Sequence, residues 1–171
     1  MLTYREKIRH YHQLGEYNCG PVALSCLFDT STSALEELVE CKQNKGTRTS
    51  KVLEVMKQQG IACSHVELGE SANNHLWWLE LASCRWAVYV SCHFVNQGAR
   101  GRPSNSHHAV LFANGLCYDG NNHREEPIAA ISQKFNKEFI IHSAIIFDGY
   151  ELPNWKKNLE SAMENTTEIF V

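Results

Sequence analysis

Cys19 is the cysteine whose neighbours give it the means for chemistry. It stands at the predicted start of a helix in NCGPVALSCLF, where Pro21 falls in the first turn. The partial positive charge of a helix N-terminus favours the thiolate, which is the nucleophilic form of cysteine. Gly20 leaves room for an approaching substrate, and Gln13 can donate an amide N–H to a developing oxyanion. The segment predicts a nucleophile, although a buried structural cysteine explains it equally well.

A predicted hairpin supplies a base for this nucleophile. The Asn-Gly pair at 114–115, between HAVLFA and LCYDG, is typical of a two-residue hairpin turn. Because strand side chains alternate between faces, this register places His108, Asp119 and Asn121 on one face and His107 on the other. An imidazole within reach of a carboxylate is what a general base and its orienting group require. A surface hairpin with an incidental histidine is disfavoured by the apolar residues around it.

The rest of the sequence predicts the elements that position these residues. Helices are expected directly after an N-cap at Asn18, over 33–42 with Ser33 and Glu36 as a capping box, and over 49–59. Strands are expected over 61–68, 85–95, 108–113 and 139–147. Helices followed by strands predict an α+β domain. A length of 171 residues fits one catalytic domain over 1–149 and a tail over 150–171, with a helix over 154–164.

Composition narrows the class of function. Sixteen basic and nineteen acidic residues give a net charge of -3, so no basic excess favours nucleic acid or an anionic membrane. The seven cysteines include no Cys-x-x-Cys pair, and the histidines form no coherent metal set, so we expect neither a metal nor a cofactor. No signal peptide or membrane helix is visible. These features predict a protein of a reducing cytosol.

The segment around Cys19 resembles the active site of papain-like cysteine peptidases. Gln13, then LGEYN, then CGPVALSCL is most similar to the bacteriocin-processing (double-glycine leader) peptidase family, which has a glutamine six residues before a Cys-Gly at its central helix. GTRTSKVLEVMKQQGI resembles the third helix of that family. HAVLFANGLCYDG resembles its histidine strand and the aspartate-containing strand that follows. The similarity covers about residues 10–120, in the family's order.

The resemblance implies a papain-like fold, with N-terminal helices packed on an antiparallel sheet. It implies Cys19 as nucleophile, His108 as base, Asp119 as orienting group and Gln13 as oxyanion donor. Asn121 is an alternative third member, because the family usually has Asp-Pro where this chain has Asp-Gly. The hairpin is also shorter than in typical members, and the transporter to which leader peptidases are usually fused is absent.

Two reactions fit this set of residues. One is cleavage of a protein or peptide, and the other is deamidation of glutamine, as in bacterial effector enzymes that have the same fold and triad. Both reactions pass through the same kind of acyl-enzyme, so the triad does not separate them. We rank the peptidase first because peptidases are the commoner members of the resembled family. A catalytically inactive binding module is the third option, and the oligomeric state is left open.

Three further residues are candidates for substrate contact. Arg100 and Arg102 precede the histidine strand in a polar loop that should border the cleft, and Trp78 is a candidate for lining it. A solvated loop and a buried aromatic are the alternatives. His10 and His12 fit neither a metal pair on a helix nor a triad, so no role is assigned to them. We expect a freestanding cytoplasmic enzyme that acts on a host or self protein, with delivery into a host cell as an option.

Overall fold

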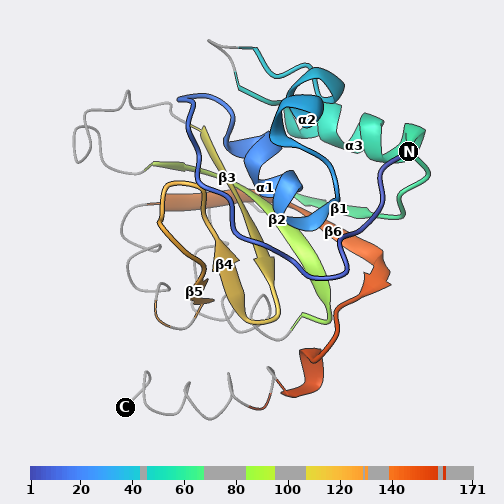
Figure 1. Ribbon diagram of the computed structural model, residues 1–171, viewed down its shortest axis with the longest axis vertical. Coiled ribbons are helices and arrows are strands. Elements are labelled where there is room, and N and C mark those ends of the chain that lie inside the picture. Colours follow the sequence, from blue (N-terminus) through green and yellow to red (C-terminus); the bar gives the residue numbers. More distant parts are fainter. Residues whose placement is uncertain are drawn as a thin grey trace.

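The protein is seen in a computed structural model that describes residues 1–42, 46–67, 84–94, 107–128, 130, 139–157 and 160. In this part of the chain, helices come first and strands follow: α1 (Cys19–Leu27), α2 (Thr32–Leu38), α3 (Thr49–Gln58), β1 (Ser64–Glu67), β2 (Trp86–Phe94), β3 (His107–Ala113), β4 (Leu116–Tyr118), β5 (Glu126–Pro127) and β6 (Phe139–Glu151). The strands form one antiparallel sheet in the order β1-β6-β2-β3-β4-β5 (Figure 1). The predicted α+β class is confirmed.

The central strands β2 and β3 send alternate side chains into two separate cores. Tyr89 and Leu111 belong to a core that they share with the three helices. Val90 follows Tyr89 on β2 and Val110 precedes Leu111 on β3. Both valines belong to a second core that includes Ile128. This alternation follows from the pleat of a strand, in which neighbouring side chains point to opposite faces. Because both faces are covered, β3 holds the residues at its start in a fixed orientation.

The helix that begins at Cys19 is buried along its length, as its apolar sequence predicts. Every residue from Gly20 to Leu27 is buried, so α1 lies inside the molecule with its N-terminus open only at Cys19. α1 packs against β3, which carries the candidate base. In Figure 1 the N-terminal segment, drawn in dark blue, passes along α1 before the chain enters it. The arrangement places the N-terminus of α1 near the start of β3.

The helix caps differ from the prediction at two places. Asn18 precedes α1, but its side chain makes no capping hydrogen bond; instead its Nδ2 donates to Glu36 Oε1 at 2.7 Å, which ties α1 to α2. The predicted capping box at Ser33 is wrong, because α2 begins earlier. Ser31 has the extended backbone that an N-cap needs, and its Oγ accepts from the Ala34 amide at 3.2 Å.

The hairpin register is confirmed. Asn114 and Gly115 have φ values of 53° and 73°, as a two-residue turn with left-handed central residues requires. Phe112 pairs with Cys117, and the ladder continues to the pair of Leu111 with Tyr118. The ladder ends there, so the strand register does not extend to Asp119 and Asn121, as the prediction of a shared face assumed. The chain turns after Tyr118, and the residues that follow form a loop.

The strand predicted over 139–147 is longer than expected and carries a β-bulge. β6 extends to Glu151, and its register to β2 shifts so that Ser91 faces Ser143 while Cys92 faces Ile141. His142 is therefore the extra residue of the bulge. Most of the tail helix expected over 154–164 lies outside the described residues. Within the described part of the chain, no helix is long and apolar enough to cross a membrane.

Candidate active site

The first residue of α1 is Cys19, and the chain packs tightly directly behind it. A Cβ on Gly20 would lie 2.9 Å from the hydroxyl oxygen of Tyr89 and 3.1 Å from Cβ of Thr47. Glycine is therefore needed here for close packing against β2 and the segment before α3. The expectation that Gly20 leaves space for a substrate is wrong, because protein atoms already fill that space.

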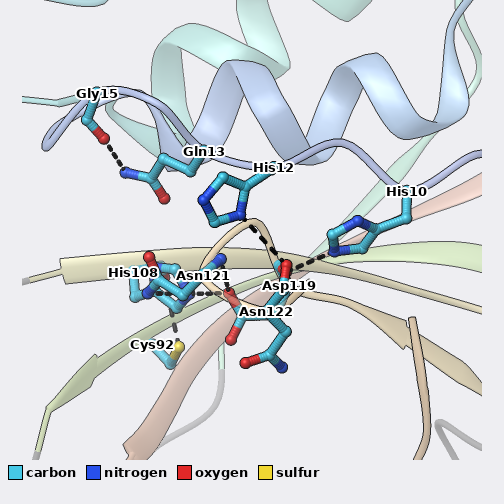
Figure 2. A network of polar contacts seen from close by, with 9 residues as sticks. All are labelled: His10, His12, Gln13, Gly15, Cys92, His108, Asp119, Asn121 and Asn122. Atoms are coloured by element: carbon cyan, nitrogen blue, oxygen red, sulfur yellow. Dashed lines mark hydrogen bonds and ion pairs between the residues drawn. The ribbon is translucent and has the colours of Figure 1, made fainter. Parts of the chain in front are cut away.

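His108 and Asp119 form a buried pair. Nε2 of His108 lies 2.8 Å from Oδ1 of Asp119, and the two residues are 2% and 5% exposed. Because a carboxylate only accepts, Nε2 carries the hydrogen and donates it. The backbone N–H of Asn121 donates to the same oxygen at 2.9 Å, which fixes the carboxylate in the loop after β4. Figure 2 shows these residues together at the start of β3.

The side chain of Cys19 is hydrogen bonded to the side chain of His108. Burial alone would raise the pKa of Cys19, but the hydrogen bond and charge of His108, with backbone hydrogen bonds of Ala109 and Gly20, outweigh it and lower the pKa. Burial likewise opposes a charge on His108. The charge and hydrogen bond of Asp119, together with Cys19, nevertheless raise the pKa of His108 to about 10. The lowered pKa of Cys19 favours its thiolate form, and the raised pKa of His108 favours the imidazolium.

Cys19 differs in this respect from every other cysteine. All seven cysteines lie in the described part of the chain, and all are free thiols. Burial raises the pKa of each of the other six: Cys26, Cys41, Cys63, Cys84, Cys92 and Cys117. A lowered thiol pKa is the signature of a reactive cysteine.

Asn121 lies next to the pair in a different way from Asp119. Its Nδ2 is 3.5 Å from Nε2 of His108, so two nitrogens face each other. Nε2 already gives its hydrogen to Asp119 at the much shorter distance of 2.8 Å. The geometry therefore favours Asp119 as the orienting group, with Asn121 holding the carboxylate through its backbone.

Gln13 lies in the segment that docks on the loop after β4. Its backbone N–H donates to the carbonyl of Gly120 at 2.7 Å. Its side-chain Nε2 donates to the carbonyl of Gly15 at 2.6 Å, which identifies the nitrogen end of the amide. Oε1 of Gln13 is buried and has no hydrogen-bond partner among the described residues. The amide nitrogen has a second hydrogen, which is the one that an oxyanion could accept.

The same segment holds residues to which the sequence assigned no role. Nε2 of His10 lies 2.8 Å from the backbone carbonyl of Asp119, and Nδ1 of His12 lies 3.4 Å from that of Asn122. No signal in the sequence pointed to these contacts, because they join residues more than a hundred positions apart. The N-terminal segment therefore contacts the loop that carries Asp119, chiefly through His10 and Gln13.

His107 is exposed whereas His108 is buried, as expected for residues on opposite faces of β3, and it contacts a separate histidine cluster that the sequence did not predict. Nδ1 of His107 and Nδ1 of His93 each lie 3.3 Å from Nε2 of His142. His142 is brought to this position by the bulge in β6. Even so, no group of three histidine, cysteine or acidic residues in the described ranges is arranged to hold a metal ion.

Arg100, Arg102 and Trp78 lie outside the described residues, so their predicted substrate contacts stay predictions. Neither the comparison with protein-family models nor the comparison with curated proteins finds a match for this chain. A function must therefore be argued from the geometry of Cys19, His108 and Asp119.

Proposed function

We propose that the protein is a cysteine-dependent amide hydrolase of papain-like fold, and that it acts as a peptidase. The observation that carries this proposal is the lowered pKa of Cys19 beside a His108 whose Nε2 donates to buried Asp119. Covalent acyl transfer uses this arrangement, in which a nucleophile is hydrogen bonded to a base and the base is hydrogen bonded to an orienting group.

In the proposed first step, the Cys19 thiolate attacks the carbonyl carbon of the substrate amide. The carbonyl oxygen becomes an oxyanion, which the backbone N–H of Cys19 and the side chain of Gln13 stabilise. His108, already protonated, then donates its proton to the departing nitrogen. The C–N bond breaks, an amine leaves, and a thioester joins the substrate acyl group to Cys19.

In the second step, neutral His108 accepts a proton from a water molecule as the water attacks the thioester. The tetrahedral intermediate collapses, the carboxylic acid leaves, and the thiolate and imidazolium return. Asp119 keeps the imidazole in the tautomer and orientation that both steps require. In this scheme the raised pKa of His108 keeps the proton available for the leaving group.

The buried charges favour an enzyme over a binding module. Removing charged groups from water is costly, and replacing a buried ion pair by apolar residues is often neutral or stabilising. A module that only binds a partner gains nothing from a thiolate, an imidazolium and a carboxylate in series. Perturbed pKa values of this kind cluster at functional sites.

The α+β architecture supports the papain-like resemblance without identifying the family. Helices precede an antiparallel sheet, the nucleophile begins a buried helix, and the base lies on a strand packed against it. The residues follow the family's order of glutamine, cysteine, histidine and aspartate. An unpaired thiolate also fits a reducing cytosol, which we propose as the place of action.

Mass spectrometry of candidate protein substrates tests the function. Wild-type protein and Cys19→Ala are each incubated with a cytosolic extract, and Cys63→Ala, which removes a partly exposed thiol of raised pKa, is the matched control. Truncated products that require Cys19 support the peptidase. The small mass gain from replacing an amide NH2 by OH, at intact length, identifies a deamidase instead. Products that persist in Cys19→Ala contradict both.

A further inference from the structure

Residues 10–13 lie along the loop 119–122 and contact it at three carbonyl groups, of which Figure 2 draws the two that His10 and His12 contact. Nε2 of His10 is 2.8 Å from the Asp119 carbonyl, the backbone N–H of Gln13 donates to Gly120 at 2.7 Å, and Nδ1 of His12 is 3.4 Å from the Asn122 carbonyl. The segment thus carries the proposed oxyanion donor at one end. At the other end it binds the backbone of the residue that orients His108.

The contact of His10 is well defined. A carbonyl oxygen only accepts, so Nε2 of His10 must carry a hydrogen, whichever charge the ring has. The same carbonyl accepts from the backbone N–H of Asn122 at 3.0 Å. Asp119 is therefore held at its backbone by His10 and Asn122, while its carboxylate is held by the Asn121 amide and His108.

The two segments are also in van der Waals contact. A Cβ on Gly120 would lie 2.9 Å from Cβ of Gln13 and 2.9 Å from Cγ1 of Val22. Glycine at this position lets residues 10–13 approach closely enough for their hydrogen bonds. This packing gives a physical reason for the Asp-Gly sequence after β4.

We propose that His10 is a positioning residue for the reaction, acting through Asp119. This inference rests on the proposed function and adds a residue to its machinery. Through the Asp119 backbone, His10 sets where the carboxylate lies relative to Nε2 of His108. That carboxylate raises the pKa of His108, and His108 in turn lowers the pKa of Cys19. Loss of the His10 hydrogen bond should therefore make Cys19 less acidic.

The pH dependence of Cys19 alkylation by iodoacetamide tests this inference without a known substrate. His10→Ala removes the donor, whereas His10→Gln keeps an N–H at a position like that of Nε2. His12→Ala is the matched control, because its contact is longer and more exposed. His108→Ala is the reference for a broken pair. Labelling is located by peptide mass spectrometry, and thermal unfolding of each variant is measured in parallel.

In a plot of the Cys19 labelling rate against pH, the acid limb is the range in which the rate falls as the thiolate is protonated. The expected result is that His10→Ala moves this acid limb to higher pH. A displacement of half a pH unit lowers the rate on that limb by about threefold, since the rate follows the thiolate fraction. His10→Gln should restore the limb, and His12→Ala should leave it in place. Gly120→Ala, which forces the two segments apart, should move it in the same direction as His10→Ala.

Two results would overturn the inference. If His10→Ala lowers the unfolding temperature but leaves the limb unchanged while His108→Ala moves it, His10 has a structural role only and the proposed function stands. If Cys19 is labelled no faster than the other cysteines and His108→Ala changes nothing, the proposed function itself fails. If His10→Ala does not fold, His10→Met takes its place, because methionine keeps the bulk of the side chain but has no hydrogen-bond donor. The same two results then decide whether His10 acts through Asp119.

Discussion

Cys19 and Cys92 both contact His108, but Cys19 contacts its side chain and Cys92 contacts its backbone carbonyl. Cys19 meets the ring of His108 and backbone hydrogen bonds of Ala109 and Gly20, and its pKa is lowered. Cys92 lies opposite His108 on β2, and its Sγ donates to the His108 carbonyl at 3.4 Å. Burial, and then the charges of Asp119 and Cys19, raise the pKa of Cys92 well above its usual value. His108 thus contacts one cysteine of lowered pKa through its ring and one of raised pKa through its backbone carbonyl.

The difference shows that burial does not decide whether a cysteine is reactive. Burial opposes the charge at both positions, and only the partners differ. Hydrogen-bond donors and a positive charge stabilise a thiolate, while a carbonyl oxygen requires the thiol to keep its hydrogen. The same reasoning applies to Cys117, where burial and the charge of Asp119 raise the pKa. Six thiols serve as apolar packing or weak donors, and one is available for chemistry.

Replacing each cysteine in turn gives the largest expected effect. Cys19→Ala should abolish rapid labelling by iodoacetamide at pH 7 and all amide hydrolysis, because no other thiol has a lowered pKa. Cys92→Ala should keep both, with a loss of stability of about 1 kcal/mol from the small cavity. Peptide mass spectrometry measures the labelling, and urea denaturation measures the stability. Fast labelling of Cys92 in the wild type would break the comparison.

Removing the imidazole should make Cys19 behave like Cys92. In His108→Ala the thiol loses its charged partner, so its pKa should return to about 8.5 or above. A thiol with a pKa of about 8.5 is only about 1% ionised at pH 6.5, so the thiolate fraction of Cys19, and with it the labelling rate, should fall. Hydrolysis should fall further, because the proton donor for the leaving group is lost as well. A pH series of labelling rates checks this; an acid limb that stays in place would show that His108 does not set the pKa.

Gln13 should separate reactivity from catalysis. Gln13→Ala should lower the rate of amide hydrolysis by about 10²–10³, the usual loss for one oxyanion donor. Alkylation by iodoacetamide forms no oxyanion, so the labelling rate of Cys19 should change little. The two rates are measured on the same preparation. An equal loss in both would mean that Gln13 supports the fold of the site instead of the oxyanion.

The two candidate orienting residues should differ in size of effect. Asp119→Ala should lower the rate of hydrolysis by less than His108→Ala, because orienting the imidazole matters less than supplying the proton donor and base. Asn121→Ala keeps the backbone N–H that binds Asp119 and should cost less. Rates of both variants with one substrate decide the order. A larger loss in Asn121→Ala would make Asn121 the third member of the triad.

The parts of the site that depend on local geometry could be predicted from the sequence. The Asn-Gly turn requires positive φ at both residues, which fixed the hairpin register and hence the shared face of His108 and Asp119. The helix start at Cys19 followed from Pro21 and the apolar run. These features need only neighbouring residues, so alternation and turn geometry suffice to derive them.

The parts that depend on the path of irregular segments could not be predicted. His10 meets Asp119 only because the N-terminal segment passes along α1 to the loop after β4, and no periodicity encodes that path. Gly20 was misinterpreted because Thr47 and Tyr89 approach it from distant parts of the chain. The bulge that turns His142 toward His93 and His107 is a feature of strand pairing, which a single strand's sequence does not reveal.

The histidine cluster on the far side of β3 gives the smallest effect and extends the comparison from thiols to imidazoles. His108 and His107 are neighbours, but His108 faces a carboxylate, whereas His107 and His93 face His142. Burial, followed by the positive charges of His93 and His107, lowers the pKa of His142 below its usual value, with Glu67 opposing. The neutral form of His142 is thus favoured by folding. In the neutral form, Nε2 of His142 has one lone pair and can accept a hydrogen bond from the Nδ1–H group of His93 or of His107.

Folded protein should therefore bind fewer protons at His142 than unfolded protein as the pH falls below about 6.5. Stability should decline with acidification in that window and level off below the folded pKa. His142→Gln keeps an acceptor oxygen that does not titrate, so this contribution should disappear in the variant. The urea midpoint of both proteins between pH 7.5 and pH 5 measures the difference, which should be small because the cluster is partly exposed. A wild-type midpoint that falls no more steeply than that of His142→Gln would show that His142, unlike His108, titrates independently of the fold.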